Sequence, residues 1–350
     1  MADATPVDPA VVDLEVLASW MDQRGLGSGP LRGAAPLSGG TQNLLLRFER
    51  DQREYVLRRP PEHKRANSDE TMRREARVLA ALAGTEVPHP RLIAAEADEQ
   101  VLGAAFYLME PVDGFTATAG LPALHSSDPA VRTAMGLSFV DALLSLHEVN
   151  SEDGALDGFG HPEGFLERQV PRWQAQLDSY RDHEGYGKPD IPHLDAVGRW
   201  LEDNRPPASP TGIIHGDYHL GNVMFRHDAG RVAAIVDWEL ATRGDPLVDL
   251  GLVVAMWPNP DGSGNGVVSV QPWDGFPPAE ALVAHYQAGS SRSLDALDWY
   301  AVLACFKTGI ILEGTHARAA AGKASKAFGD LLHATTVGLF EKAHLIMARA

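Results

Sequence analysis

The segment Ile213-Ile214-His215-Gly216-Asp217-Tyr218-His219-Leu220-Gly221-Asn222-Val223-Met224 is the most informative part of this 350-residue sequence. A short apolar run, typical of a buried strand, leads into a polar loop, and a second apolar run follows at once. Strands at both ends hold such a loop on a rigid base, which suits catalytic side chains. Asp217 can orient a hydroxyl group for phosphoryl transfer, and Asn222 can offer a neutral amide oxygen to Mg²⁺.

A second acidic loop follows along the chain. The apolar run 232–236 ends at Asp237-Trp238-Glu239. A single aspartate at the end of a strand is usually a turn former, but two acidic loops, each preceded by an apolar strand, favour a metal or phosphate site. The spacing His215-x-Asp217-x-His219 also fits a metal-dependent hydrolase, and this alternative stays open.

Together these segments resemble the signature of the aminoglycoside phosphotransferase and choline kinase superfamily. The longer string Asp237–Leu250, DWELATRGDPLVDL, is similar to the branch whose members also occur as kinase-like domains fused to acyl-CoA dehydrogenases. The resemblance extends from about Leu37 to at least Gly314. It implies a bilobal, protein-kinase-like α+β fold, with a small β-rich N-lobe over 1–112 and a larger, mostly helical C-lobe over 113–350.

The hydrophobic patterns agree with this division. In the N-terminal part they predict the order helix, three strands, helix and two strands. The C-terminal part reads as helices around the β segment 212–236. The helical patterns cover 9–24, 68–82, 130–147, 165–180, 193–201, 247–256, 279–287, 294–309 and 326–348, and the strand patterns of the N-terminal part cover 31–37, 44–49, 55–58, 92–94 and 105–109.

The resemblance also implies a role for each residue of the two acidic loops. Asp217 is expected to be the catalytic base or the residue that orients the hydroxyl, with His215 as an organiser of the catalytic loop. Asn222 and Asp237 are expected to bind the metal ion. His219 is left between a substrate contact and a structural role.

The N-terminal residues that resemble a nucleotide site lie on three segments. A loop between two strands offers glycine N–H groups to phosphates, Arg58 stands where better-known kinases have a lysine, and Glu75 is its expected ion-pair partner. The hinge over about 107–113 is expected to bind adenine through its backbone. The residues expected to bind the nucleotide are Gly39, Gly40, Thr41, Asn43, Arg58, Glu75, Met109, Glu110 and Val112.

The function implied by the resemblance is transfer of the γ-phosphoryl group of ATP, with Mg²⁺, to a hydroxyl of a small molecule. The acceptor is open between an aminoglycoside and another hydroxyl-bearing metabolite or hydroxyacyl compound. Because Arg58 replaces the lysine, an ATP-binding pseudokinase is the second reading. The acidic residues Glu280, Asp295, Asp298 and Glu313 are expected on solvated helix faces.

Composition limits the possible partners. With 44% hydrophobic and 22% charged residues, the sequence is that of a folded protein. A formal net charge of −17 argues against nucleic acid or an anionic membrane as partner. No apolar run approaches the ~18 residues that span a membrane, and the N-terminus lacks a signal-peptide pattern. A cytoplasmic monomer or homodimer is therefore expected, with Cys305 as a buried thiol.

Overall fold

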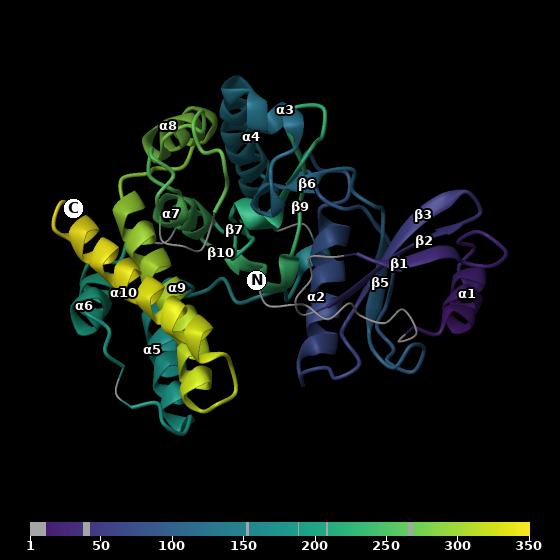
Figure 1. Ribbon diagram of the computed structural model, residues 1–350, viewed down its shortest axis with the longest axis horizontal. Coiled ribbons are helices and arrows are strands. Elements are labelled where there is room, and N and C mark those ends of the chain that lie inside the picture. The colour runs from purple at the N-terminus through teal and green to yellow at the C-terminus, as the bar shows by residue number, and fades with distance from the viewer. Residues whose placement is uncertain (1–11, 38–42, 152–153, 188, 208, 265–268) are drawn as a thin grey trace. The chain divides into compact units, whose positions relative to one another are not determined.

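The chain forms two compact units (Figure 1). The computed structural model describes residues 12–37, 43–151, 154–187, 189–207, 209–264 and 269–350. The first unit comprises Met1–Asp113, Glu152–Asp157 and Ala234–Glu239, and the second comprises Gly114–Ser151, Gly158–Ala233 and Leu240–Ala350. The segment with the second acidic loop, 234–239, thus belongs to the first unit although it lies far along the chain.

An antiparallel five-stranded sheet is the centre of the first unit. Its strand order is β1-β2-β3-β5-β4. At the β2–β3 turn Asp51 and Gln52 both have positive φ, at 51° and 61°, which matches the right-handed twist of a tight hairpin. The unit contains α1 (Leu14–Gln23), β1 (Arg32–Pro36), β2 (Leu44–Arg50), β3 (Arg53–Arg59), α2 (Ser68–Ala81), β4 (Leu92–Glu96) and β5 (Phe106–Met109).

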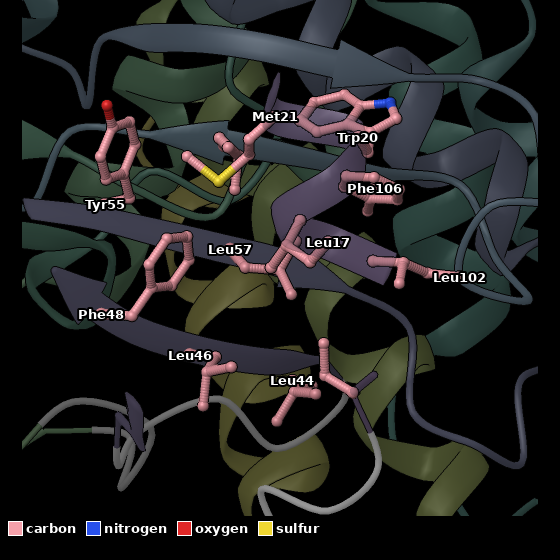
Figure 2. Packing of buried hydrophobic residues seen from close by; sticks show 12 residues of the cluster. Leu17, Trp20, Met21, Leu44, Leu46, Phe48, Tyr55, Leu57, Leu102 and Phe106 are labelled. Carbon is pink, nitrogen blue, oxygen red and sulfur yellow. The ribbon is translucent and has the colours of Figure 1, made fainter. Parts of the chain in front are cut away.

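Helix α1 packs its apolar face onto this sheet. Asp13 caps the helix by accepting hydrogen bonds from the N–H groups of Glu15 and Val16. Figure 2 shows the side chains of α1 meeting those of the strands, and Trp20 contacts the Phe106 ring edge to face at 4.8 Å between centroids. The other residues of this core are Val12, Leu17, Met21, Leu44, Leu46, Phe48, Tyr55, Leu57, Leu102 and Leu108.

Helices dominate the second unit, with short strands among them. Strand β7 pairs with β10, and β6 pairs with β8, both antiparallel. The elements are β6 (Phe115–Thr116), α3 (Ala123–Ser127), α4 (Pro129–His147), α5 (Gln169–Ser179), α6 (Leu194–Asp203), β7 (Gly212–Ile214), β8 (Val223–Phe225), β10 (Thr242–Gly244), α7 (Leu247–Met256), α8 (Ala279–Gly289), α9 (Leu297–Ala320) and α10 (Lys326–Met347). Strand β9 (Val232–Ile235) begins in this unit and ends in the first.

The α+β fold expected from the sequence is confirmed, but helix α9 is longer than expected. It continues through Gly309 to Ala320 instead of ending there. Gly309 marks a close helix contact and not a helix end, because a Cβ at this position would lie 2.7 Å from the Phe340 ring of α10. Figure 1 shows α9 and α10 side by side, and they pack along their lengths.

The burial of individual side chains corrects one expectation from the sequence and agrees with others. Glu313 was expected on a solvated face, but it is fully buried because α10 covers this part of α9. Glu280, Asp295 and Asp298 are exposed, as expected. Cys305 is buried as predicted, and burial raises the pKa of its thiol to about 12. Within the described residues, no helix combines the length and apolar character that a membrane crossing requires.

The contact between α7 and α9 depends on a residue without a side chain. A Cβ at Gly251 would lie 2.5 Å from the backbone carbonyl carbon of Tyr300. We expect Gly251→Ala to lower the free energy of unfolding by about 1–3 kcal/mol, because two helix backbones would have to move apart. Urea unfolding followed by circular dichroism measures this change.

Gly338→Ala in α10 is the matched control. This position is also inside a helix, and an added Cβ there meets nothing within 4 Å. We expect it to be neutral or to stabilise by up to about 1 kcal/mol, since alanine is the better helix former. Equal effects of the two substitutions would contradict the packing argument.

Candidate active site

The loop between β7 and β8, residues 215–222, is held by one buried carboxylate. Asp249, in the first turn of α7, accepts hydrogen bonds from the N–H of His215 at 2.6 Å and from that of Gly216 at 2.9 Å. Gly216 has φ +85°, and a Cβ there would lie 2.6 Å from the carbonyl oxygen of Leu240. Only glycine therefore fits this turn without strain. Asp249 thus has a structural role in this loop.

Two neighbours complete the support of loop 215–222. The buried His215 ring accepts a hydrogen bond at Nδ1 from the N–H of Asp217, so it shapes the loop as expected. Lys307 of α9 donates from Nζ to the carbonyl oxygen of Gly216 at 2.5 Å. Sequence reasoning missed Lys307, although it is the one charged residue in the apolar run 299–310, and that pattern was the available signal.

Asp217 and Asn222 face each other across the loop. The Asn222 amide donates from Nδ2 to Oδ2 of Asp217 at 2.9 Å and to its carbonyl oxygen at 3.0 Å. His219 Nε2 lies 3.4 Å from Asp217 Oδ2, and His219 Nδ1 accepts from the N–H of Gly221. Burial works to raise the pKa of Asp217, but His219, with the charges of Lys307 and His215, holds it down to about 2. Asp217 is therefore an ionised hydrogen-bond acceptor at neutral pH.

In the first unit, Arg58 of β3 joins two carboxylates. Its Nε lies 2.9 Å from Glu75 Oε2 of α2, which is the ion pair expected from the sequence. Its Nη2 lies 2.9 Å from Asp237 Oδ1. Tyr107 donates its hydroxyl to the same Glu75 carboxylate at 2.7 Å. Burial opposes the charge of Arg58, but Glu75, Tyr107 and Asp237 raise its pKa, so the guanidinium stays protonated.

Asp237 stands two residues after the end of β9, in a left-handed conformation with φ +66° that aspartate adopts more readily than most residues. Its side chain is 40% exposed. Carboxylate oxygens of Glu75, Asp237 and Glu239 lie within 4.8 Å of one another. Carboxylate oxygens suit Mg²⁺, so Asp237 and Glu239 fit the ion that the sequence implies, whereas Glu75 is engaged by Arg58 and Tyr107.

The predicted nucleotide-binding residues are only partly described. Gly39, Gly40 and Thr41 lie outside the described residues, and Asn43 is half-buried just before β2. At the end of β5, the backbone of Met109 pairs with Leu92 and Val56 in the sheet.

At Glu110 the structure limits which backbone group could bind adenine. The N–H of Glu110 donates to the carbonyl oxygen of Arg91 at 2.9 Å, which leaves its own carbonyl as the group that can face a base. The contact expected from Val112 stays a prediction.

The two hydrogen bonds to Asp249 lead to a stability prediction. Asp249→Asn replaces one acceptor oxygen with a donor, so one buried N–H of loop 215–222 loses its partner. We expect the free energy of unfolding to fall by about 1–3 kcal/mol in urea titrations. Asp298→Asn, an exposed aspartate in the first turn of α9, is the control and should change it by less than about 0.5 kcal/mol. A neutral Asp249→Asn would show that the loop does not depend on this carboxylate.

Comparisons with known proteins agree with this geometry. The model of the phosphotransferase enzyme family matches residues 33–300. Acyl-CoA dehydrogenase family member 11 of Gallus gallus is 33% identical over 82% of this chain, and that of Homo sapiens is 31% identical over 87%. The chain spans only 37% and 39% of those two proteins.

Solved structures show the same likeness. A protein of Ralstonia eutropha JMP134, provisionally described as an aminoglycoside phosphotransferase, has a TM-score of 0.80 and 29% identity, with 97% of this chain and 99% of that chain covered. A thermostable mutant of aminoglycoside phosphotransferase APH(4)-Ia in ternary complex with ADP and hygromycin B shares the fold, with a TM-score of 0.53, 17% identity, and 91% and 97% covered. The resemblance noted in the sequence is confirmed: the chain belongs to the phosphotransferase enzyme family.

Proposed function

We propose that this chain transfers the γ-phosphoryl group of ATP to a hydroxyl group of a small molecule, with Mg²⁺. The observation that carries the proposal is the contact of Arg58 with both Glu75 and Asp237. A buried guanidinium fixed by one carboxylate is positioned to bind phosphate, and a half-exposed carboxylate beside it is positioned to bind a metal ion. Phosphoryl transfer needs both groups.

Asn222 and Asp237 are the proposed magnesium ligands. The Asn222 amide donates hydrogen bonds from Nδ2 to Asp217, so its Oδ1 is the atom that can bind a cation. When bound, Mg²⁺ supplies positive charge that neutralises the nucleotide phosphates.

Asp217 is proposed to accept a hydrogen bond from the attacking hydroxyl and so orient it for in-line transfer. Asn222 and His219 hold the Asp217 carboxylate from one side. Lys307 and Asp249 fix the backbone of loop 215–222 and thereby the position of that carboxylate.

The contacts of two histidines argue against the alternative of a metal-dependent hydrolase. His215 is fully buried, with Nδ1 engaged by the N–H of Asp217, and His219 Nδ1 is engaged by the N–H of Gly221. The pseudokinase reading rests on arginine at position 58 and is the second candidate. Retention of Asp217, Asn222 and Asp237 favours an active enzyme.

A small cavity lies beside loop 215–222. It encloses about 70 Å³, and its lining includes Trp173, Arg172 and Lys307. Asp249 is the carboxylate in that lining, and it is already engaged by two backbone N–H groups. Ligand pockets usually enclose ~300–1,000 Å³, so this cavity does not decide the acceptor, which stays open between an aminoglycoside and another hydroxyl-bearing metabolite or hydroxyacyl compound.

Asp217→Asn tests the catalytic role. We expect turnover to fall at least about a hundredfold, because the hydroxyl loses its charged acceptor. The affinity for Mg·ATP should stay within a few-fold, since Asp217 is not a proposed nucleotide ligand. The assay is ATP depletion with an acceptor found by screening metabolites and aminoglycosides.

Asp228→Asn is the control for this substitution. Asp228 follows β8 on the surface and pairs with Arg226, and its loss should leave turnover unchanged. Full activity of Asp217→Asn against the acceptor would refute the assignment.

Asp237→Asn tests the metal site separately. We expect Mg²⁺ to increase the affinity of the wild-type chain for ATP. In the variant this increase should be at least about tenfold smaller. Isothermal titration of ATP with and without Mg²⁺ measures the difference. Asp51→Asn is a matched control, because Asp51 also has a left-handed backbone, with φ 51°, but lies in an exposed hairpin turn. An unchanged magnesium dependence in Asp237→Asn would exclude this ligand.

A further inference from the structure

Three side chains of metal-ligating types meet between helices α9 and α10, apart from the residues of the proposed active site. The Nδ1 atom of His333 lies 2.8 Å from Oε2 of Glu313. The rings of His316 and His333 stack with centroids 4.5 Å apart. One ligand atom from each of the three residues lies within 4.8 Å of the others. All three belong to the second unit, and the proposed phosphoryl transfer gives them no role.

The spacing along both helices explains why these side chains converge. Glu313 and His316 are three residues apart on α9, and Asp330 and His333 are three residues apart on α10. Residues at this spacing share one helix face, and carboxylate-x-x-histidine pairs on facing helices are a known way to bind metal ions in helical bundles. Gly329 allows the approach, because a Cβ there would lie 2.5 Å from Cβ of Ala319 and 3.3 Å from Cα of His316.

The polar atoms of this cluster are incompletely satisfied. Glu313 is fully buried, and its second oxygen accepts a hydrogen bond from the Tyr186 hydroxyl at 2.9 Å. Nδ1 of His316 is buried and has no hydrogen-bond partner among the described residues. The nearest carboxylate oxygen recorded for it, on Asp330, lies 3.7 Å away. A buried nitrogen without a partner is unusual and points to a ligand at this position.

We propose that Glu313, His316 and His333 bind a divalent transition-metal ion, with Zn²⁺ as the best match. Two imidazole nitrogens and one carboxylate oxygen form a ligand set that zinc prefers and that magnesium and calcium do not. In a tetrahedral site, ligand atoms stand about 3.3 Å apart, so the Glu313 and His333 atoms must separate by roughly half an ångström.

The surroundings complete the site. The hydrogen bond from Tyr186 orients the Glu313 carboxylate, as groups behind metal ligands commonly do. Three protein ligands leave a fourth position for water or for Asp330. The bound ion would fasten α9 to α10 and stabilise the second unit, with no part in phosphoryl transfer.

Cobalt provides a direct test on the full chain. The protein is stripped with a chelator, kept in excess Mg²⁺ to occupy oxygen-only sites, and titrated with CoCl₂. We expect the intense visible absorption of tetrahedral Co²⁺, saturating at one ion per chain and lost when ZnCl₂ is added. The melting temperature should rise with the first equivalent of Zn²⁺ and no further.

Matched variants locate the site. His333→Asn should weaken Zn²⁺ binding at least about a hundredfold, whereas His344→Gln, an exposed histidine of the same helix, should leave it unchanged. Should His333→Asn fail to fold, His316→Asn serves in the same comparison, and the wild-type cobalt spectrum is decisive by itself. Only the weak absorption of hydrated cobalt, or Zn²⁺ binding equal in wild type and variants, would overturn the proposal and leave the cluster as a hydrogen-bonded pair of Glu313 and His333.

Discussion

The buried carboxylate of Asp249 is the constraint on which the proposed catalytic loop depends. It accepts hydrogen bonds from two consecutive backbone N–H groups at a turn where Gly216 has a left-handed backbone that a side chain would not fit. Because both donors are buried, the loop cannot shift without leaving polar groups unpaired. Lys307 donates a hydrogen bond to a carbonyl oxygen of the same turn, that of Gly216. Asp217 and Asn222 thus project from a backbone fixed from two sides, as precise positioning of a hydroxyl requires.

The first unit buries a cation, the guanidinium group of Arg58. Arg58 is only 8% exposed, and Glu75 is 1% exposed, so each would be costly without the other. Tyr107 adds a neutral donor to the pair, and Asp237 contributes a second carboxylate from a half-exposed position. The buried half of the network is structural, and its exposed half is available to a ligand. The planar guanidinium of Arg58 contacts both carboxylates at once, a geometry compatible with the phosphate-binding role proposed for it.

Sequence reasoning succeeded where a signal is local. The strand-loop-strand pattern around Asp217, the family resemblance, the Arg58–Glu75 pair and the buried Cys305 all follow from short motifs, from a resemblance that carries their spacing, or from composition. It failed where distant segments decide the outcome. Glu313 is buried by α10, Gly309 is a packing site and not a helix end, and Lys307 reaches loop 215–222 from α9. For Glu313 and Gly309 no periodicity or motif in a single sequence reveals the contact, whereas Lys307 stood out as a lone charge in an apolar run but its partner did not.

Transfer of a labelled γ-phosphoryl group from ATP tests the central claim most directly. The wild-type chain is incubated with Mg²⁺, labelled ATP and a pool of hydroxyl-bearing metabolites and aminoglycosides, and the products are separated. The account predicts label in an organic phosphate that forms only with Mg²⁺ present. Tight binding of Mg·ATP with no label leaving the nucleotide, or release of inorganic phosphate alone, would contradict it.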